Sequence, residues 1–168
     1  MTILHEPNGY VGGYLVTNVW GRPLEFRLST AVQPNRIQQI LYGQALEPYI
    51  YADLIGKALI DRASTQVQLI LTDRAPVLEL RPRIEVPVVY ISAMKESSPS
   101  EQGSNAVRIL AASNGMPPAF CHSRFGGDQE IVSTLLNRLC ECIELAEPFD
   151  RVREAVCEAR KMGASIRA

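Results

Sequence analysis

Hydrophobic residues in this chain fall into short runs separated by turn residues and into longer stretches with helical spacing. Runs rich in apolar, β-branched and aromatic residues predict β-strands. Residues 13–20 and 24–29 flank Gly21, Arg22 and Pro23, a combination typical of a hairpin turn. Further strands are expected at residues 67–71, 77–81, 86–92, 106–112 and 118–124.

Apolar residues spaced by three and four positions predict helices between these strands. In residues 34–63, Ile37, Ile40 and Leu41 share one helical face, and Gly43 is expected to end that helix. Two more helices are expected near the end of the chain. Their apolar faces comprise Ile131, Leu135, Leu139 and Cys142 in the first helix and Val152, Val156 and Ala159 in the second.

The expected order of elements is ββ-αα-βββ-ββ-αα. Short connections between neighbouring strands favour antiparallel pairing, and grouped strands and helices favour the α+β class. The sequence therefore predicts a single α+β domain over residues 1–168, with a mostly antiparallel sheet of about seven strands and about four helices. Residues 94–105 are Ser-rich and without periodicity, so they are expected to form a loop.

A shift of 94 residues aligns segments 13–47 and 107–141 with seven identities. The identical pairs are Gly21 with Gly115, Pro23 with Pro117, Phe26 with Phe120, Ser29 with Ser123, Ile37 with Ile131, Leu41 with Leu135 and Glu47 with Glu141. This pattern predicts an internal duplication of halves 13–63 and 106–162, joined by a three-stranded segment at 67–92. In this interpretation the phenylalanines face inward and the Ile and Leu pairs line the helices. Independent convergence of hairpins and helix starts on the same residues is the alternative.

The net charge and the composition of the chain disfavour several classes of function. The 17 basic and 18 acidic residues give a net charge of −1, which does not favour a nucleic-acid binder. No apolar run approaches the roughly 18 residues of a membrane span, and the first ten residues lack the layout of a signal peptide. We therefore expect a cytoplasmic protein with four reduced cysteines. Motifs for a metal, a dinucleotide or a phosphate loop are missing from the sequence, so no metal and no cofactor are expected.

The most reactive-looking segment runs from Cys121 to Asp128, between a predicted strand and a helix N-terminus. A helix N-terminus can stabilise a thiolate or a bound anion. Cys121 and His122 are weak catalytic candidates, because adjacent strand residues point to opposite faces, with Cys121 in the core and His122 toward solvent. Arg124 and Asp128 are the candidates for anion binding, and Asp128 is also expected to cap the helix.

A second candidate surface combines one tryptophan with four arginines. Trp20, Arg22, Arg27, Arg81 and Arg83 come from the first two predicted hairpins. If these hairpins are neighbours, Arg27 and Arg81 share a face. Because Arg and Trp are enriched in protein interfaces, this set predicts a contact surface for a partner, although outward polar alternation explains it equally simply.

These observations favour a non-catalytic interaction or assembly subunit of a cytoplasmic complex, bound to itself or to another protein. A net charge near zero gives little colloidal protection, which suits a chain held in a complex. One alternative is a small enzyme or ligand-binding domain that uses residues 121–128. A nucleic-acid-associated accessory protein is the second alternative.

Overall fold

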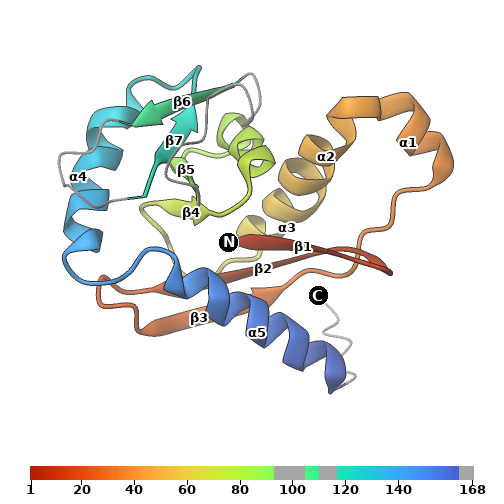
Figure 1. Cartoon of the computed structure of the whole chain (residues 1–168), viewed down its shortest axis with the longest axis horizontal. Helices are drawn as coiled ribbons and strands as arrows, with labels where there is room; N and C mark the ends of the chain where they lie inside the picture. Colours follow the sequence, from red (N-terminus) through yellow and green to blue (C-terminus); the bar gives the residue numbers. More distant parts are fainter. Residues whose placement is uncertain (93–104, 110–116, 163–168) are drawn as a thin grey trace.

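The strands of this α+β protein form two separate sheets (Figure 1). The computed structural model describes residues 1–92, 105–109 and 117–162. An antiparallel sheet has the order β1 (Thr2–Glu6), β2 (Gly9–Thr17), β3 (Pro23–Leu28). A mixed sheet has the order β4 (Ile70–Thr72), β5 (Val88–Ile91), β7 (Ala119–His122), β6 (Ala106–Ile109). The predicted α+β class is confirmed, whereas the single, mostly antiparallel sheet is wrong.

The segment between β4 and β5 causes this difference. Residues 77–81 were expected to form a strand, but Ala75–Arg83 form the 3₁₀ helix η3. Its Val77, Leu78 and Leu80 are buried. A tight hairpin can join only antiparallel strands. Because η3 forms a longer connection from the end of β4 to the start of β5, these two strands pair in parallel. A short apolar run such as this one fits a strand or a helix equally well, so periodicity alone gave the wrong element.

The predicted hairpin of residues 13–29 is confirmed by β2 and β3. Strand β1 was not expected; it pairs with β2 after a turn in which Gly9 has a φ of +110°. The predicted strand 106–112 is β6 as far as residue 109, and its remainder lies outside the described residues. The same holds for the predicted loop 94–105, except Asn105.

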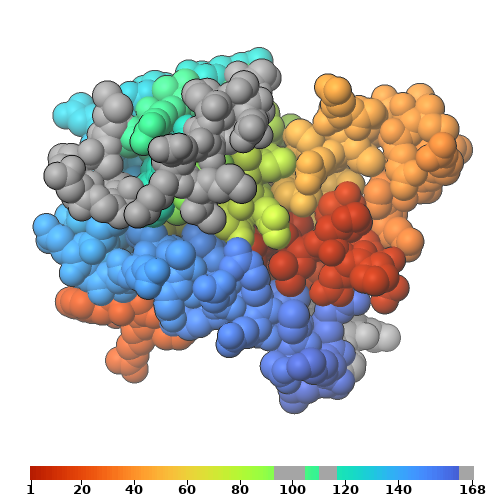
Figure 2. All heavy atoms as spheres, in the orientation of Figure 1, coloured from red at the N-terminus to blue at the C-terminus, as the bar shows by residue number. Residues whose placement is uncertain are grey.

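A continuous helical arm follows the first sheet. It consists of α1 (Arg36–Tyr42), the 3₁₀ turn η1 (Gly43–Ala45), α2 (Leu46–Pro48), the π-helix η2 (Tyr49–Gly56) and α3 (Lys57–Asp61). Gly43, with a φ of +50°, ends α1 as expected. The inner part of the arm packs in the main core through Ile50, Ile55 and Leu59. Its outer end, α1, projects from the body (Figures 1 and 2).

Two further helices, α4 (Asp128–Cys140) and α5 (Glu147–Lys161), complete the fold. Helix α5 lies against β1 and β2, and its Val152 and Val156 are buried as predicted. Helix α4 buries Val132 and Leu136, whereas the residue predicted to open the apolar face, Ile131, is 57% exposed. The buried face of α4 is therefore rotated by one residue from the prediction.

Two consecutive glycines in β2 allow helices to pack closely on both faces of the first sheet. A Cβ atom at Gly12 would lie 2.2 Å from Ile55 Cγ2 of η2. A Cβ atom at Gly13 would lie 2.8 Å from Val152 Cγ1 of α5. Adjacent strand residues face opposite sides, so each glycine makes room for one helix.

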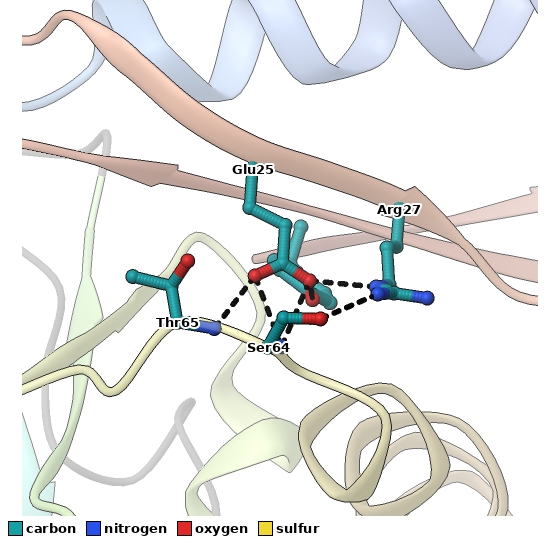
Figure 3. A network of polar contacts seen from close by, with 5 residues as sticks. Glu25, Arg27, Ser64 and Thr65 are labelled. Carbon is teal, nitrogen blue, oxygen red and sulfur yellow. Dashed lines mark hydrogen bonds and ion pairs between the residues drawn. The ribbon is translucent and has the colours of Figure 1, made fainter.

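A polar network fastens β3 to the segment that follows α3 (Figure 3). The Glu25 carboxylate accepts hydrogen bonds from Tyr14 Oη at 2.5 Å and Arg27 Nε at 2.6 Å. It also accepts the backbone N–H groups of Ser64 and Thr65 at 2.8–3.1 Å. These bonds, led by that of Arg27, hold the pKa of Glu25 well below its ordinary range. Burial, and then Glu25 itself, raise the pKa of Tyr14 to about 12.

The structure corrects part of the duplication hypothesis. Phe120 is fully buried, but its counterpart Phe26 is 38% exposed. Ile37 and Ile131 both lie on helices as expected, and both are exposed. The second turn, around Gly115, lies outside the described residues, and the duplication itself stays a prediction.

Candidate functional site

The most distinctive surface of the described chain is the apolar face of α1. Ile37 is 67% exposed, Ile40 is 66% exposed and Leu41 is 76% exposed. We call these three residues the α1 face. They have the spacing that places them on one side of a helix, and within the described residues α1 buries none of its own side chains. Within the described residues, this stripe is an apolar surface that the rest of the chain does not cover.

Local interactions stabilise α1, which does not pack in the described core. Asn35 Oδ1 accepts the backbone N–H of Gln38 at 2.8 Å, and Gln38 Oε1 accepts the backbone N–H of Asn35 at 3.0 Å. This reciprocal pair is a capping box, which stabilises a helix start. At the other end, Tyr42 stacks on Tyr49 with ring centroids 4.5 Å apart. The α1 face is thus presented on an ordered helix.

A second exposed apolar group lies on the β2–β3 hairpin. It comprises Val19, Trp20, Leu24 and Phe26, and Figure 1 places the turn of this hairpin at the opposite end of the molecule from α1. The Asn18 side-chain oxygen accepts the backbone N–H groups of Trp20 and Arg22 and orders the turn. Trp20 is 73% exposed, with Arg22 exposed beside it.

The other three arginines of the predicted interface lie elsewhere in ion pairs. Arg27 is held by Glu25 on β3, while Arg81 of η3 binds Asp128. Arg83 pairs with Asp53 of the helical arm. The condition under which Arg27 and Arg81 would share a face, two neighbouring hairpins, is not met, because residues 77–81 belong to the 3₁₀ helix η3.

Cys121 and His122 are both buried, each only 1% exposed. Cys121 packs in the core with Val89 and Ile109, as expected. His122 was expected to face solvent, but η3 covers that side of β7. His122 Nδ1 accepts the backbone N–H of Arg124 at 3.2 Å, and its Nε2 lies 3.5 Å from Glu79 Oε1.

The geometry does not favour Cys121 as a nucleophile. Burial, reinforced by the charge of Asp128, raises the pKa of the Cys121 thiol. A reactive cysteine needs the opposite, a lowered pKa and access to solvent.

Thiol labelling provides a direct check. In the native protein we expect Ellman's reagent to modify the exposed Cys142 and Cys157 about a hundredfold faster than the buried Cys121. The reagent reacts with the thiolate, and burial hinders both the ionisation of the Cys121 thiol and the access of the reagent to it. All four cysteines should react at similar rates in denaturant. Native reactivity of Cys121 equal to that of Cys157 would restore the nucleophile hypothesis.

The two residues predicted to bind an anion do not form a common site. Arg81 Nε and Nη2 donate to the two Asp128 carboxylate oxygens at 2.6 and 3.1 Å. Asp128 therefore does not cap α4, whose N-cap is Gly127, and the expected capping role is wrong. The Arg124 side chain is exposed, whereas Asp128 is largely buried and engaged by Arg81. Arg81 also lies over the Phe125 ring, 4.2 Å from its centroid.

Sequence reasoning missed a polar groove of about 1,020 Å³ between the helical arm and η3. Its lining includes Tyr49, Tyr51, Tyr90, Arg74 and Glu79. These residues come from segments far apart in the chain and carry no shared motif, so no sequence signal could have found the groove. Asn105 Nδ2 donates to Glu79 Oε1 at 2.7 Å at its edge.

The chain matches no protein-family model, no curated protein and no solved structure. Within the described residues, every helix is too short or too polar to cross a membrane.

Proposed function

We propose that this protein is a non-catalytic interaction subunit that docks through the α1 face onto an apolar groove of another protein. The observation that supports the proposal is an ordered helix whose three aliphatic side chains are all at least 66% exposed. Burying one such side chain is worth about 1.5–3 kcal/mol, so covering the face supplies much of the free energy of a specific contact.

The chemistry of α1 indicates the kind of partner. Arg36 is the one charged residue of the helix, and its other polar residues are the neutral Gln38 and Gln39. A partner therefore needs an apolar groove more than a complementary charge, as in helix-in-groove recognition, where anchors are spaced i, i+3 and i+4. The exposed Trp20 and Arg22 at the far hairpin offer a second contact of the type enriched in interfaces.

We also propose a reducing, cytoplasmic location for this subunit. The four cysteines Cys121, Cys140, Cys142 and Cys157 are all free. Free exposed thiols such as Cys142 and Cys157 persist in a reducing compartment.

Charge substitution on the α1 face tests the proposal. Ile37→Glu/Leu41→Glu should abolish assembly, because two carboxylates cannot enter an apolar groove without a large desolvation cost. The fold should remain intact, since α1 contributes nothing to the described core. Gln39→Glu/Gln44→Glu is the matched control, because it adds the same charge at exposed positions outside the α1 face.

The readout is co-purification from the source cells together with light scattering after size exclusion. Wild type and the control should elute in an assembly heavier than the 18.6 kDa chain, and the α1-face variant as a single chain. A wild-type mass of one chain with no co-purifying protein would refute the proposal. So would an assembly that the α1-face variant retains in full.

A further inference from the structure

A largely apolar cavity of about 450 Å³ lies where the first sheet, β4, helices α3, α4 and α5 and the segment between α3 and β4 meet. Its lining includes Val16, Leu24, Leu69, Leu135, Leu139 and Phe149. Pockets for small molecules have volumes of roughly 300–1,000 Å³ and mostly apolar walls. This cavity is separate from the α1 face, because none of the described residues that line it belongs to α1.

Among the described residues that line this cavity, the one charged side chain is a cation. None of the described residues that line it is acidic. Arg138, in the last turn of α4, contributes an exposed guanidinium that has no hydrogen-bond or ion-pair partner among the described residues. The Met1 amino group is already engaged, since it donates to the Leu71 carbonyl oxygen at 2.7 Å. Burial lowers the pKa of that amine to about 6.

We propose that the cavity binds a single-chain anionic amphiphile, with its alkyl chain among the apolar walls and its head group on Arg138. Guanidinium groups bind carboxylates and phosphates through two parallel hydrogen bonds, so either head group fits this chemistry. An apolar cavity of about 150 Å³ accommodates one benzene molecule, and three times that volume suits a chain of roughly twelve carbons.

The lining also argues against other ligand classes. A cationic amphiphile would place its charge beside Arg138 with no acidic group among the described lining residues to balance it. A nucleotide or sugar would place many of its polar groups against the apolar side chains that form most of the lining. A neutral alkyl chain would fill the cavity but would leave the Arg138 guanidinium without an anionic partner.

Isothermal titration calorimetry with octanoate, decanoate and dodecanoate, all below their critical micelle concentrations, tests the proposal. The Kd should fall about fourfold for each added methylene, the factor expected when a methylene leaves water. If the site recognises only the negative charge, dodecyl phosphate and dodecanoate should bind with similar Kd values. If one of them binds more tightly, that ligand identifies the preferred head group. Dodecyltrimethylammonium should bind at least about tenfold more weakly than dodecanoate, because its charge repels Arg138.

Two variants localise the site. Arg138→Gln should weaken dodecanoate about fivefold and leave dodecanol unchanged, while Arg108→Gln, at an exposed arginine outside the cavity, should change neither. Leu135→Trp should abolish binding of every chain by filling the cavity, with circular dichroism reporting whether the fold persists. The proposal is overturned if no chain binds saturably, if the cationic detergent binds as tightly as dodecanoate, or if Arg138→Gln weakens dodecanol as much as dodecanoate.

Discussion

Replacing Asp128 with alanine is expected to lower the free energy of unfolding by about 3 kcal/mol. The Arg81 and Asp128 side chains are only 13% and 12% exposed, and they join η3 to the first turn of α4. Arg81 Nη1 also donates to the Ile84 carbonyl oxygen at 2.7 Å. Removing the carboxylate leaves a largely buried guanidinium without its counter-charge, and the cost of that unpaired charge dominates the loss.

The measurement is urea unfolding at pH 7 followed by circular dichroism. Asp61→Ala breaks the exposed ion pair with Lys57 and should cost less than about 0.5 kcal/mol, which makes it a matched control. In the double variant Arg81→Met/Asp128→Leu no buried charge is left unpaired, so it should be more stable than Asp128→Ala. Equal, small losses for Asp128→Ala and Asp61→Ala would show that the buried pair is not a structural link.

Replacing Glu25 with glutamine is expected to lower the midpoint of urea unfolding markedly at pH 7. Glutamine keeps the shape of Glu25 but has one acceptor oxygen and no charge, so it cannot satisfy the four donor groups that meet there. The bonds of Arg27, Ser64 and Thr65 weaken together, and β3 loses its attachment to the segment after α3 (Figure 3).

The pH dependence of this effect has a definite sign. The folded state holds the pKa of Glu25 well below the ordinary value of about 4.3, so the unfolded chain takes up its proton first as the pH falls. The stabilisation by Glu25 is therefore complete above about pH 5 and is lost progressively in more acidic solution. The difference between wild type and Glu25→Gln should shrink from pH 5 toward pH 2. A difference that stays constant over this range would contradict the assigned role of Glu25.

Local signals in the sequence were sufficient where one short segment determines the structure. Gly21 and Pro23 lie between two apolar runs, and the β2–β3 hairpin follows from these few residues. Gly43 ends α1 for an equally local reason, its positive φ. Periodicity also grouped Ile37, Ile40 and Leu41 on one helical face.

Periodicity could not show which helical faces meet the core. The residues of the α1 face have the spacing of core residues, yet they are exposed because no other described element packs against them. In α4, Val132 and Leu136 face the second sheet instead of Ile131. These outcomes depend on the placement of other elements, which a single helical pattern does not contain.

Long-range polar contacts were equally hidden. Arg81 and Asp128 are 47 positions apart and meet only because η3 is a helix beside α4. Glu25 and Thr65 are 40 positions apart. The apolar cavity near Arg138 likewise combines residues from both sheets and three helices, so only the folded chain reveals it.

Site-specific photo-crosslinking tests the docking role of α1 most directly. A photoreactive phenylalanine analogue at Leu41 lies on the α1 face, and the same analogue at Gln39 lies on the opposite side of the same short helix. In the source cells, we expect irradiation to join the chain to one protein of defined mass from position 41 and not from position 39. No adduct from position 41, or equal adducts from both positions, would contradict docking through this face.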